Sequence, residues 1–256
     1  MFNPKHILIT GASSGIGAAL ARLYAAPGMR LALHGRNSER LTDVARYCEQ
    51  HGAKVAMSAG DVTNAAEMAA WIAACHQTQP IDLLVANAGI SAGTGGGRET
   101  IEQSRAILAV NLDGVLNTVR PAIDLMRGRR RGQIAIMSSL AGFRGLPGAP
   151  SYAASKAAVR VYGEALRAEL APNNVEVNVI CPGFVRTPMT AVNRFTMPMI
   201  MDVERAALII RDGLAQNRAR IAFPWPMYFL VRLFAALPDR LVTFLAGKLP
   251  RKPAQG

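Results

Sequence analysis

Short apolar runs alternate with longer amphipathic segments along most of this chain. The short runs are hydrophobic at almost every position, as expected for strands of a parallel sheet that is covered by helices on both faces. The predicted strands cover residues 5–10, 30–34, 54–58, 81–86, 133–137, 175–180 and 219–223. The predicted helices cover residues 15–26, 38–51, 65–77, 101–126, 151–170 and 203–216. The alternation predicts an α/β fold with a doubly wound, mostly parallel, seven-stranded Rossmann-type sheet.

The alternation ends near residue 224, and no linker or internal repeat interrupts it. We therefore expect residues 1–224 to form a single domain and residues 225–256 to form a C-terminal amphipathic helical extension. Two apolar stripes follow in that extension, one on each side of Pro238, which is a natural hinge. The first stripe comprises Phe229, Leu230, Leu233, Phe234 and Leu237, and the second comprises Leu241, Phe244, Leu245 and Leu249.

Three roles are open for the extension. It could pack against its own subunit or a dimer mate. It could bind an anionic membrane surface, because apolar stripes flanked by cations suit acidic lipid. It could also cover the mouth of the substrate site. The cations in question are Arg232, Arg240, Lys248, Arg251 and Lys252.

The charge of the chain narrows the choice of partners only a little. A formal net charge of +12 over 256 residues favours anionic partners: nucleic acid, acidic lipid or phosphorylated ligands. The basic run at residues 129–131 lies between glycines and has no nucleic-acid-binding signature around it, so we expect no nucleic acid partner. Cys48, Cys75 and Cys181 have no metal-like spacing, and no metal site is expected. The N-terminus lacks a signal-peptide pattern, which predicts a cytoplasmic location with membrane association left open.

The first predicted strand runs directly into a glycine-rich turn. Gly11, Gly15 and Gly17 follow the strand and open the first helix. Glycines permit a tight turn and a close approach of the backbone to a phosphate, and the start of a helix offers free N–H groups to a pyrophosphate. In this strand–turn–helix context the pattern predicts a dinucleotide-binding site.

A tyrosine and a lysine four residues apart are the main candidates for chemistry. Tyr152 and Lys156 share one face of the helix predicted at 151–170, so their side chains can meet. A free tyrosine has a pKa of about 10, and a cation beside it is expected to lower that pKa toward the working range. Ser139, at the end of the fifth predicted strand, could hold the oxygen of a carbonyl or alcohol. The alternative for the pair alone is an exposed tyrosine stacked on a lysine stem.

Taken together, these motifs resemble those of the short-chain dehydrogenase/reductase family, in its branch with a Tyr-x-x-x-Lys pair. The resemblance covers about residues 5–224. One departure is Ala86, where the family usually has asparagine. The motifs that match in order are the turn from Thr10 to Gly17, Asp61 with Val62, Asn87-Ala88-Gly89, Asn111, Ser138 with Ser139, Tyr152 with Lys156, Pro182 with Gly183, and Thr187.

The resemblance implies that residues 1–224 bind NAD(P) and carry the catalytic residues. Tyr152 is then the general acid in carbonyl reduction or the base in alcohol oxidation, Lys156 lowers its pKa and binds the nicotinamide ribose, and Ser139 positions the substrate oxygen. Asn111 completes a proton relay by holding a water near Lys156, and Ser138 lines the cofactor site. The implied cofactor-binding residues are Gly11, Ser13, Ser14, Gly15, Ile16, Gly17, Arg36, Asp61, Val62, Asn87, Ala88, Gly89, Tyr152, Lys156, Pro182, Gly183, Val185 and Thr187.

Charge at the end of the second predicted strand bears on which nicotinamide cofactor is used. An enzyme that uses NAD normally has a carboxylate there for the ribose hydroxyls. Residues 33–37 read Leu-His-Gly-Arg-Asn, without an acid, and the planar guanidinium of Arg36 suits a 2′-phosphate. We therefore expect NADP(H) rather than NAD(H), with Arg40 as a second contact. The alternative is that Arg36 is an ordinary surface residue.

The expected function is that of an NADP(H)-dependent oxidoreductase that interconverts a carbonyl and a secondary alcohol on a small molecule. We expect residues 185–201 to form the substrate loop, because the methionines at 189, 197, 199 and 201 suit an irregular apolar ligand, although methionines are also ordinary core residues. Some family members that metabolise lipids carry hydrophobic C-terminal segments, which implies an apolar or lipid-like substrate. The family also pairs the helices predicted at 101–126 and 151–170 across subunits, which implies a homodimer or homotetramer. The alternative function is that of a cofactor-binding regulatory or scaffolding protein with little turnover.

Overall fold

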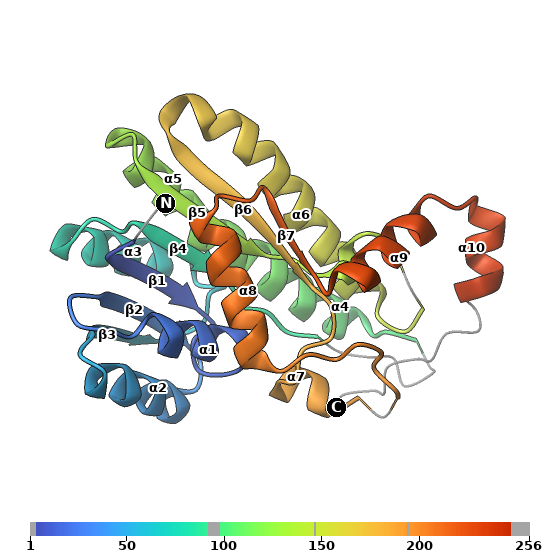
Figure 1. Ribbon diagram of the computed structural model, residues 1–256, viewed down its shortest axis with the longest axis horizontal. Coiled ribbons are helices and arrows are strands. Elements are labelled where there is room, and N and C mark those ends of the chain that lie inside the picture. Colours follow the sequence, from blue (N-terminus) through green and yellow to red (C-terminus); the bar gives the residue numbers. More distant parts are fainter. Residues whose placement is uncertain (1–3, 92–97, 146, 194, 247–256) are drawn as a thin grey trace.

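Seven parallel strands form one sheet, in the order β3-β2-β1-β4-β5-β6-β7 (Figure 1). The computed structural model describes residues 4–91, 98–145, 147–193 and 195–246. The strands are β1 (His6–Thr10), β2 (Arg30–Gly35), β3 (Lys54–Ala59), β4 (Leu83–Ala86), β5 (Gly132–Met137), β6 (Val175–Pro182) and β7 (Arg220–Phe223). The doubly wound fold predicted from the alternating pattern is confirmed, and every predicted strand end lies within two residues of the observed one.

The strand order reverses at β1. This strand pairs with β2 on one side and with β4 on the other, so that Ile9 lies beside Leu33 and Val85. From β1 the chain first adds β2 and β3 on one side of this strand, and it then adds β4 to β7 on the other side. In open α/β sheets, ligands bind in the crevice that forms beyond the carboxyl ends of the strands at such a reversal. The fold therefore marks the ends of β1 and β4 as the place for a site.

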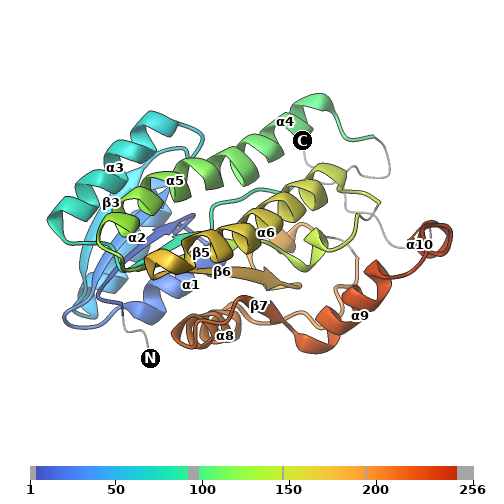
Figure 2. The same cartoon turned by 90° about the horizontal axis from the view of Figure 1, so that it is seen from above.

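Helices cover both faces of the sheet (Figure 2). One face carries α1 (Gly15–Tyr24), α2 (Ser38–Gln50) and α8 (Val203–Ala215). The other carries α3 (Ala65–Thr78), α5 (Gly114–Gly128) and α6 (Pro150–Leu170), with α4 (Ile101–Leu108) packed on α6. The short α7 (Pro188–Ala191), then α9 (Trp225–Ala235) and α10 (Asp239–Ala246), lie toward the carboxyl ends of the strands (Figure 1).

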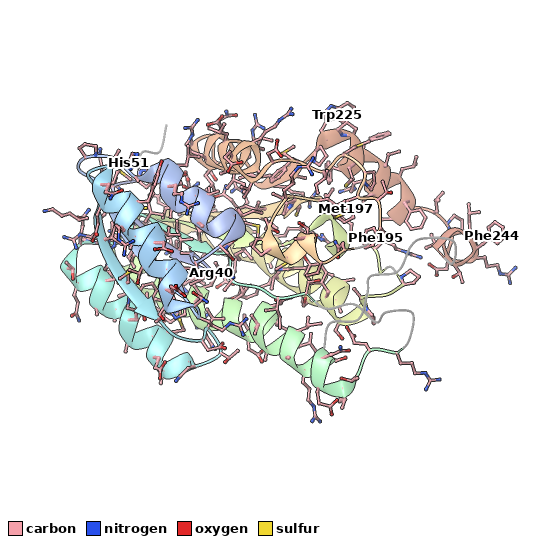
Figure 3. All side chains as sticks on the ribbon, turned by 90° about the horizontal axis from the view of Figure 1, so that it is seen from below. Arg40, His51, Phe195, Met197, Trp225 and Phe244 are labelled. Carbon is pink, nitrogen blue, oxygen red and sulfur yellow. The ribbon has the colours of Figure 1, made fainter. Side chains whose placement is uncertain are left out.

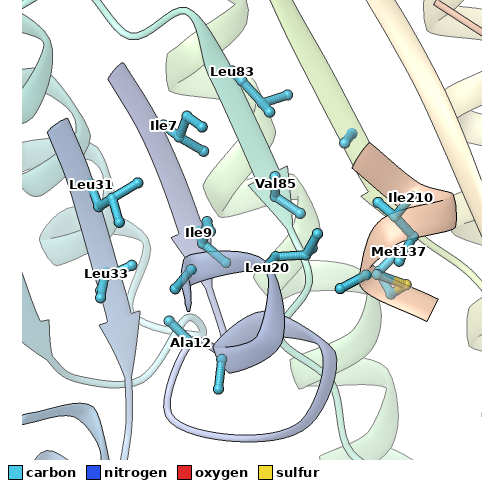
Figure 4. Packing of buried hydrophobic residues seen from close by; sticks show 14 of the residues in the cluster. Ile7, Ile9, Ala12, Leu20, Leu31, Leu33, Leu83, Val85, Met137 and Ile210 are labelled. Carbon is cyan, nitrogen blue, oxygen red and sulfur yellow. The ribbon is translucent and has the colours of Figure 1, made fainter. Parts of the chain in front are cut away.

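The core consists of two apolar layers, one on each side of the sheet. Alternate residues of the inner strands enter alternate layers, so Ile9 enters one and Leu8 the other. This double burial is why the strands are apolar at nearly every position and do not alternate with polar residues. Figure 4 shows part of the first layer, in which Ile7, Ile9, Leu31, Leu33, Leu83 and Val85 pack with Ala12, Leu20, Met137 and Ile210.

The helix predicted over residues 101–126 is interrupted. A π-helical turn, η1 (Ala109–Asp113), joins α4 to α5, and the N–H of Gly114 donates to the carbonyl of Ala109 five residues earlier. Such turns are rare and are frequent at functional sites. Asn111 lies inside this turn. The prediction of one continuous α-helix was wrong because an apolar pattern does not register one additional residue in a turn.

The extension packs on the domain through one face of α9. Met227, Tyr228 and Val231 contact a small cluster formed by Leu140, Val179 and Cys181. The opposite face is exposed, and Figure 3 shows Trp225 on the outer side of α9, with Phe244 on α10 beyond it. α9 begins at Trp225, because a proline such as Pro226 is tolerated in the first turn of a helix.

None of the helices in the described part of the chain is both long and apolar enough to cross a bilayer. The basic residues Lys248, Arg251 and Lys252 and the apolar Leu249, which were predicted to belong to the extension, lie outside the described residues.

Candidate active site

A cavity of about 340 Å³ lies at the carboxyl edge of the sheet, where β1 and β4 separate. It is lined by the turn after β1, by the ends of β2 to β5, by the start of α6 and by the segment after β6. All of the residues predicted to bind the cofactor line it except Gly17. Of the predicted catalytic residues, Ser139, Tyr152 and Lys156 line it and Asn111 does not. The cavity has two ends: the α6 end (Ser139, Tyr152 and Lys156) and the β2 end (His34, Arg36, Asn37 and Arg40).

The glycine turn between β1 and α1 is packed as closely as its sequence predicts. Gly11 has a φ of +66°, and a Cβ on it would lie 2.8 Å from the Cα of Ala88. A Cβ on Gly17 would lie 2.3 Å from the carbonyl oxygen of Gly11. Gly17 does not line the cavity. Its lack of a side chain leaves room for the backbone of Gly11 in the turn. The side chain of Ser14 makes no capping hydrogen bond, so the first-turn N–H groups of α1 remain available to an anion, and the turn fits a pyrophosphate.

Asn87 fastens the end of β4 to the glycine turn. Its Nδ2 donates to the carbonyls of Thr10 (3.0 Å) and Gly11 (3.2 Å). The hydroxyl of Thr10 in turn accepts from the backbone N–H groups of Asn87 (3.1 Å) and Ala88 (3.2 Å). Asn87 therefore shapes the cavity wall by holding two strand ends together, a role that its place after the fourth predicted strand did not reveal.

Ser139 and Tyr152 meet at the α6 end of the cavity. Ser139 follows β5 and caps the short 3₁₀ turn η2 (Leu140–Gly142), where its Oγ accepts from the N–H of Ala141 at 3.1 Å. The same hydroxyl donates to the carbonyl of Pro182 at 3.4 Å, and it lies near enough to the phenol of Tyr152 to act on that group's pKa. A carbonyl oxygen that entered between these two hydroxyls would receive a hydrogen bond from each. The neighbouring Ser138 instead donates to the backbone carbonyl of Lys156 at 2.7 Å and so holds α6 against β5.

Lys156 is buried beside them. Its side chain is 3% exposed, and its Nζ donates to the carbonyl of Met137 at 3.0 Å and lies 5.8 Å from the ring centroid of Tyr152. Burial lowers the pKa of Lys156 from 10.5 to about 8. Gly89 permits this placement, because a Cβ there would lie 3.3 Å from Nζ. The exposed tyrosine–lysine stack considered from the sequence does not describe this pair.

The pKa of Tyr152 moves in the direction opposite to that expected. Burial raises the pKa of Tyr152, and the nearby hydroxyl of Ser139 only partly opposes this. The spacing of the two residues predicted that the ammonium of Lys156 would lower this pKa, but spacing contains no information about how deeply the phenol lies. The side chain is therefore a neutral phenol that can donate its proton.

Asn111 holds two segments in place through its amide. Its Oδ1 accepts from the N–H of Ile90 at 2.8 Å, and its Nδ2 donates to the carbonyl of Ile90 at 2.9 Å and to the Oγ of Ser155 at 3.0 Å. Ser155 in turn donates to the carbonyl of Tyr152 at 2.8 Å. A Cβ on Gly89 would approach both Asn111 Oδ1 and Lys156 Nζ, at 3.1 and 3.3 Å, so the amide and the ammonium flank the same glycine.

The β2 end of the cavity is positively charged and solvent-exposed. Arg36 and Arg40 line it, and Arg36 lies 3.9 Å from the carboxylate of Asp61, with the two side chains 61% and 41% exposed. Burial acts to raise the pKa of Asp61, but hydrogen bonds with Thr63 and the charge of Arg36 outweigh it, and the pKa of Asp61 is lowered. The carboxylate expected in an NAD site at the end of β2 is absent.

Several residues that line the cavity were not predicted from the sequence. They are His34, Gly35, Asn37, Gly60, Ile90, Val110 and Met137. Most of them adjoin predicted residues at strand ends, so extending each motif by one residue would have found Ile90 and Met137. Val110 lies on the π turn, and this turn was not predicted from the sequence.

The methionines of residues 185–201 divide between two environments. Met189 lines the cavity and is 37% exposed, whereas Met201 belongs to the buried core. The Nδ2 of Asn193 donates to the sulfur of Met197 at 3.3 Å, and Figure 3 shows Met197 close to Phe195. Only Met189 is therefore in contact with the cavity.

Two arginines and a phenylalanine fasten α9 to α6. The guanidinium groups of Arg160 and Arg220 lie 4.8 and 5.4 Å from the ring centroid of Phe143, and both donate to the carboxylate of Glu164. Arg220 also donates to the hydroxyl of Tyr228 on α9 at 3.0 Å. Beside this cluster, the sulfur of Met227 packs directly on the cavity-lining Gly183, so the start of the extension forms the outer layer of the cavity wall.

Comparison with known proteins assigns the family. A model described as short chain dehydrogenase matches residues 5–197. An uncharacterized oxidoreductase of Myxococcus xanthus is 36% identical over 243 residues, which are 94% of this chain and 96% of the relative. The chain therefore belongs to the short-chain dehydrogenase/reductase family and is an oxidoreductase.

Solved structures of the family extend the match to three dimensions. A short-chain dehydrogenase/reductase from Burkholderia phymatum in complex with NAD superposes with a TM-score of 0.84 at 25% identity, over 100% of this chain and 99% of that one. A short-chain dehydrogenase from Sphingobium yanoikuyae in complex with NADPH gives 0.80 at 26% identity, over 98% of each chain. A nicotinamide cofactor is therefore supported for this protein.

Proposed function

We propose that this protein is an NADP(H)-dependent oxidoreductase that interconverts a carbonyl and a secondary alcohol. The observation that carries the proposal is that Ser139, Tyr152 and Lys156 lie in the same cavity as the glycine turn. When bound, the cofactor supplies the hydride, and the protein supplies orientation and the proton. The hydroxyls of Ser139 and Tyr152 hold the substrate oxygen, and the neutral phenol donates its proton to that oxygen in the reductive direction.

Lys156 and Asn111 support the proton transfer in this proposal. The ammonium of Lys156 stabilises the phenolate that Tyr152 becomes after donation, and it binds the ribose hydroxyls of the nicotinamide half. Asn111 is a positioning residue, since its amide fixes Ile90 and Ser155 beside the two. A water held near Lys156 would complete the relay to solvent. The alternative, a regulatory or scaffolding protein, gives no reason for burying a lysine so deeply at this point.

The preference for NADP(H) rests on the charges at the β2 end. Arg36 and Arg40 are both at hand for a 2′-phosphate, and Arg40 makes no ion pair within the described part of the chain. The carboxylate of Asp61 partly neutralises Arg36, so Arg40 supplies the uncompensated charge. A 2′-hydroxyl, in contrast, finds no carboxylate at the end of β2.

The wall around the α6 end favours an apolar substrate. Met189 and Val185 line the cavity, and Met227 packs behind Gly183, which lies close to Leu140 beside the α6 end. We assign residues 185–201 to the substrate loop, and we propose that α9, at the start of the extension, bounds the substrate mouth. Helices α4 and α6 present exposed apolar residues, namely Ile101, Leu108 and Val161, that suit a homodimer interface.

The outer face of the extension is proposed to contact an anionic lipid surface. Trp225, Phe229, Leu230 and Leu233 are each more than half exposed, and the exposed Arg232 lies on the same helix. An apolar face flanked by cations suits the interface of an acidic bilayer. Flotation with phosphatidylserine vesicles tests this: the wild type should bind, and a Phe229→Ser/Leu233→Ser variant should not. Met57→Ser, at the opposite edge of the sheet, is the matched control, and wild-type protein that stays unbound would contradict the contact.

Turnover tests the proposed activity directly. A series of methyl ketones from butanone to methyl decyl ketone is assayed with NADPH and with NADH, following nucleotide absorbance and the alcohol product. We expect kcat/KM to rise with chain length and to be higher with NADPH. Failure to reduce any ketone or to oxidise any of the matching alcohols would contradict the activity, and a higher kcat/KM with NADH would contradict the cofactor preference alone.

A further inference from the structure

A carboxylate outside the cavity accepts hydrogen bonds from the start of α6, the helix that carries Tyr152 and Lys156. Glu99 precedes α4, and its Oε2 accepts three hydrogen bonds: from the N–H of Ser151 at 3.1 Å, from the hydroxyl of Ser151, and from the hydroxyl of Ser104 at 3.1 Å. Ser104 lies on α4 and Ser151 on α6, and these helices pack side by side (Figure 2). One oxygen atom therefore joins the two helices immediately before Tyr152.

The start of α6 lacks a cap of its own. Ala149, the residue before the helix, has no side-chain acceptor, and Pro150 follows it as the first helical residue. The N–H of Ser151 consequently has no partner within the helix, as is general for first-turn N–H groups. The negative charge of Glu99 meets that donor at the positive end of the helix, where an anion is stabilising.

The second carboxylate oxygen of Glu99, Oε1, has a different environment from Oε2. Oε1 is buried and has no hydrogen-bond partner within the described part of the chain. A buried carboxylate oxygen without a partner is costly. Among the described residues, the hydrogen bonds of this side chain are therefore all made by Oε2, and they lead to α4 and α6.

We propose that Glu99 is a positioning residue that caps α6 from outside the helix and fixes the orientation of Tyr152. The inference rests on the proposed role of Tyr152, which is the next residue after the one that Glu99 holds. Loss of the cap frees the first turn of α6, and the phenol then departs from its place beside Ser139. The glycine turn and the β2 end do not depend on this contact.

Steady-state kinetics with NADPH and the best ketone of the methyl ketone series test the proposal. Glu99→Ala should lower kcat by about tenfold or more, because small displacements of a reacting group are costly. The KM for NADPH should stay within about twofold of wild type, since the interactions removed act on the chemical step. Glu99→Gln retains an acceptor and should recover most of kcat. Glu102→Ala removes an exposed carboxylate on the same segment and should leave both parameters unchanged.

The outcomes separate positioning from folding. If Glu99→Ala does not fold, Ser151→Ala removes one of the three donors and should still lower kcat without changing the KM for NADPH. The proposal is overturned if Glu99→Ala or Ser151→Ala retains wild-type kcat, or if Glu99→Gln is as impaired as Glu99→Ala. An unimpaired Glu99→Ala combined with an inactive Tyr152→Phe would overturn the positioning role alone, whereas an active Tyr152→Phe would overturn the proposed function itself.

Discussion

The two ends of the cavity differ in how firmly their charged side chains are held. At the α6 end, Lys156 is 3% exposed and donates to a backbone carbonyl at 3.0 Å. At the β2 end, Arg36 is 61% exposed in its side chain and lies 3.9 Å from its only ion-pair partner among the described residues. Interactions of exposed charges are weak and screened by salt, whereas those of buried groups are strong and fixed. In the proposed function, the groups for proton transfer are therefore fixed by the fold, whereas the charges proposed to select the nucleotide are exposed and contribute less.

The largest expected effect concerns the α6 end. Tyr152→Phe keeps the ring and removes the proton, so kcat should fall by about 10³-fold, as for loss of a general acid. Binding of NADPH, followed by fluorescence titration, should be nearly unchanged because the ring still fills its place. Tyr162→Phe, on the same helix and away from the cavity, is the control. Turnover close to wild type in Tyr152→Phe would remove the basis for calling this end the reactive one.

The second largest effect is expected in the glycine turn, where an added side chain would crowd the backbone. Gly17→Ala places a methyl group 2.3 Å from the carbonyl oxygen of Gly11, so the free energy of unfolding should fall by about 1–3 kcal/mol. Denaturant titration measures this, and NADPH binding should weaken as well. A Cβ on Gly128 meets no atom within 4 Å, so Gly128→Ala should be neutral or stabilising. Equal stability of the two variants would contradict the close packing of the turn.

Burial of Lys156 predicts a specific dependence of stability on pH. Its pKa is lowered from 10.5 in the unfolded chain to about 8 in the folded protein. Between these values the unfolded chain retains a proton that the folded protein has released, so the free energy of unfolding rises with pH. Relative to Lys156→Met, the wild type should gain up to about 2 kcal/mol from pH 7.5 to 9.5, at about 1.36 kcal/mol per unit.

Chemical denaturation of both proteins across this range measures the difference between them, and the half-buried Tyr152 is common to both and cancels. Curves that run parallel over the whole range would show that the lysine is not desolvated in solution. The offset between the curves at pH 7.5 is not informative, because the methionine also removes the hydrogen bond to Met137.

The smallest effect is expected at the β2 end. Replacing both Arg36 and Arg40 by alanine should lower the ratio of kcat/KM for NADPH to that for NADH by about tenfold, the value of one charge-assisted contact at moderate exposure. The difference should shrink as the salt concentration rises, because both side chains are accessible to ions. Arg46→Ala, on the exposed side of α2 and paired with Asp43, is the control. A ratio that does not respond to the double substitution would show that charge at this end does not select the cofactor.

The sequence predicted the sheet, its site edge and most of the cavity lining because those features depend on local pattern. The apolar strands and the glycines at the first turn can be recognised from the type and position of neighbouring residues, without knowledge of the tertiary structure. Likewise, the spacing of Tyr152 and Lys156 correctly placed the two side chains together. Their separation along a helix is a local quantity.

What the sequence did not predict depends on depth and on contacts between distant segments. The pKa of Tyr152 is raised because the surrounding protein desolvates the half-buried phenol, and no spacing rule contains desolvation. The stripe of Phe229, Leu230 and Leu233 was identified, yet only the structure reveals that Met227, Tyr228 and Val231 are the residues that pack inward. Glu99 was not noticed at all, because its partner on α6 is 52 positions away.

The π turn at Ala109–Asp113 has a consequence for the rotational register of the long α4–α5 rod. One residue added to a turn rotates everything before it by about 100° relative to an uninterrupted α-helix. The side chains of α4 that face α6, Ser104 among them, do so only in this rotated setting. Deleting a single residue from the turn would therefore rotate α4 about its own axis by about 100° relative to α5. The sequence of α4 would be unchanged, but different side chains of α4 would face α6.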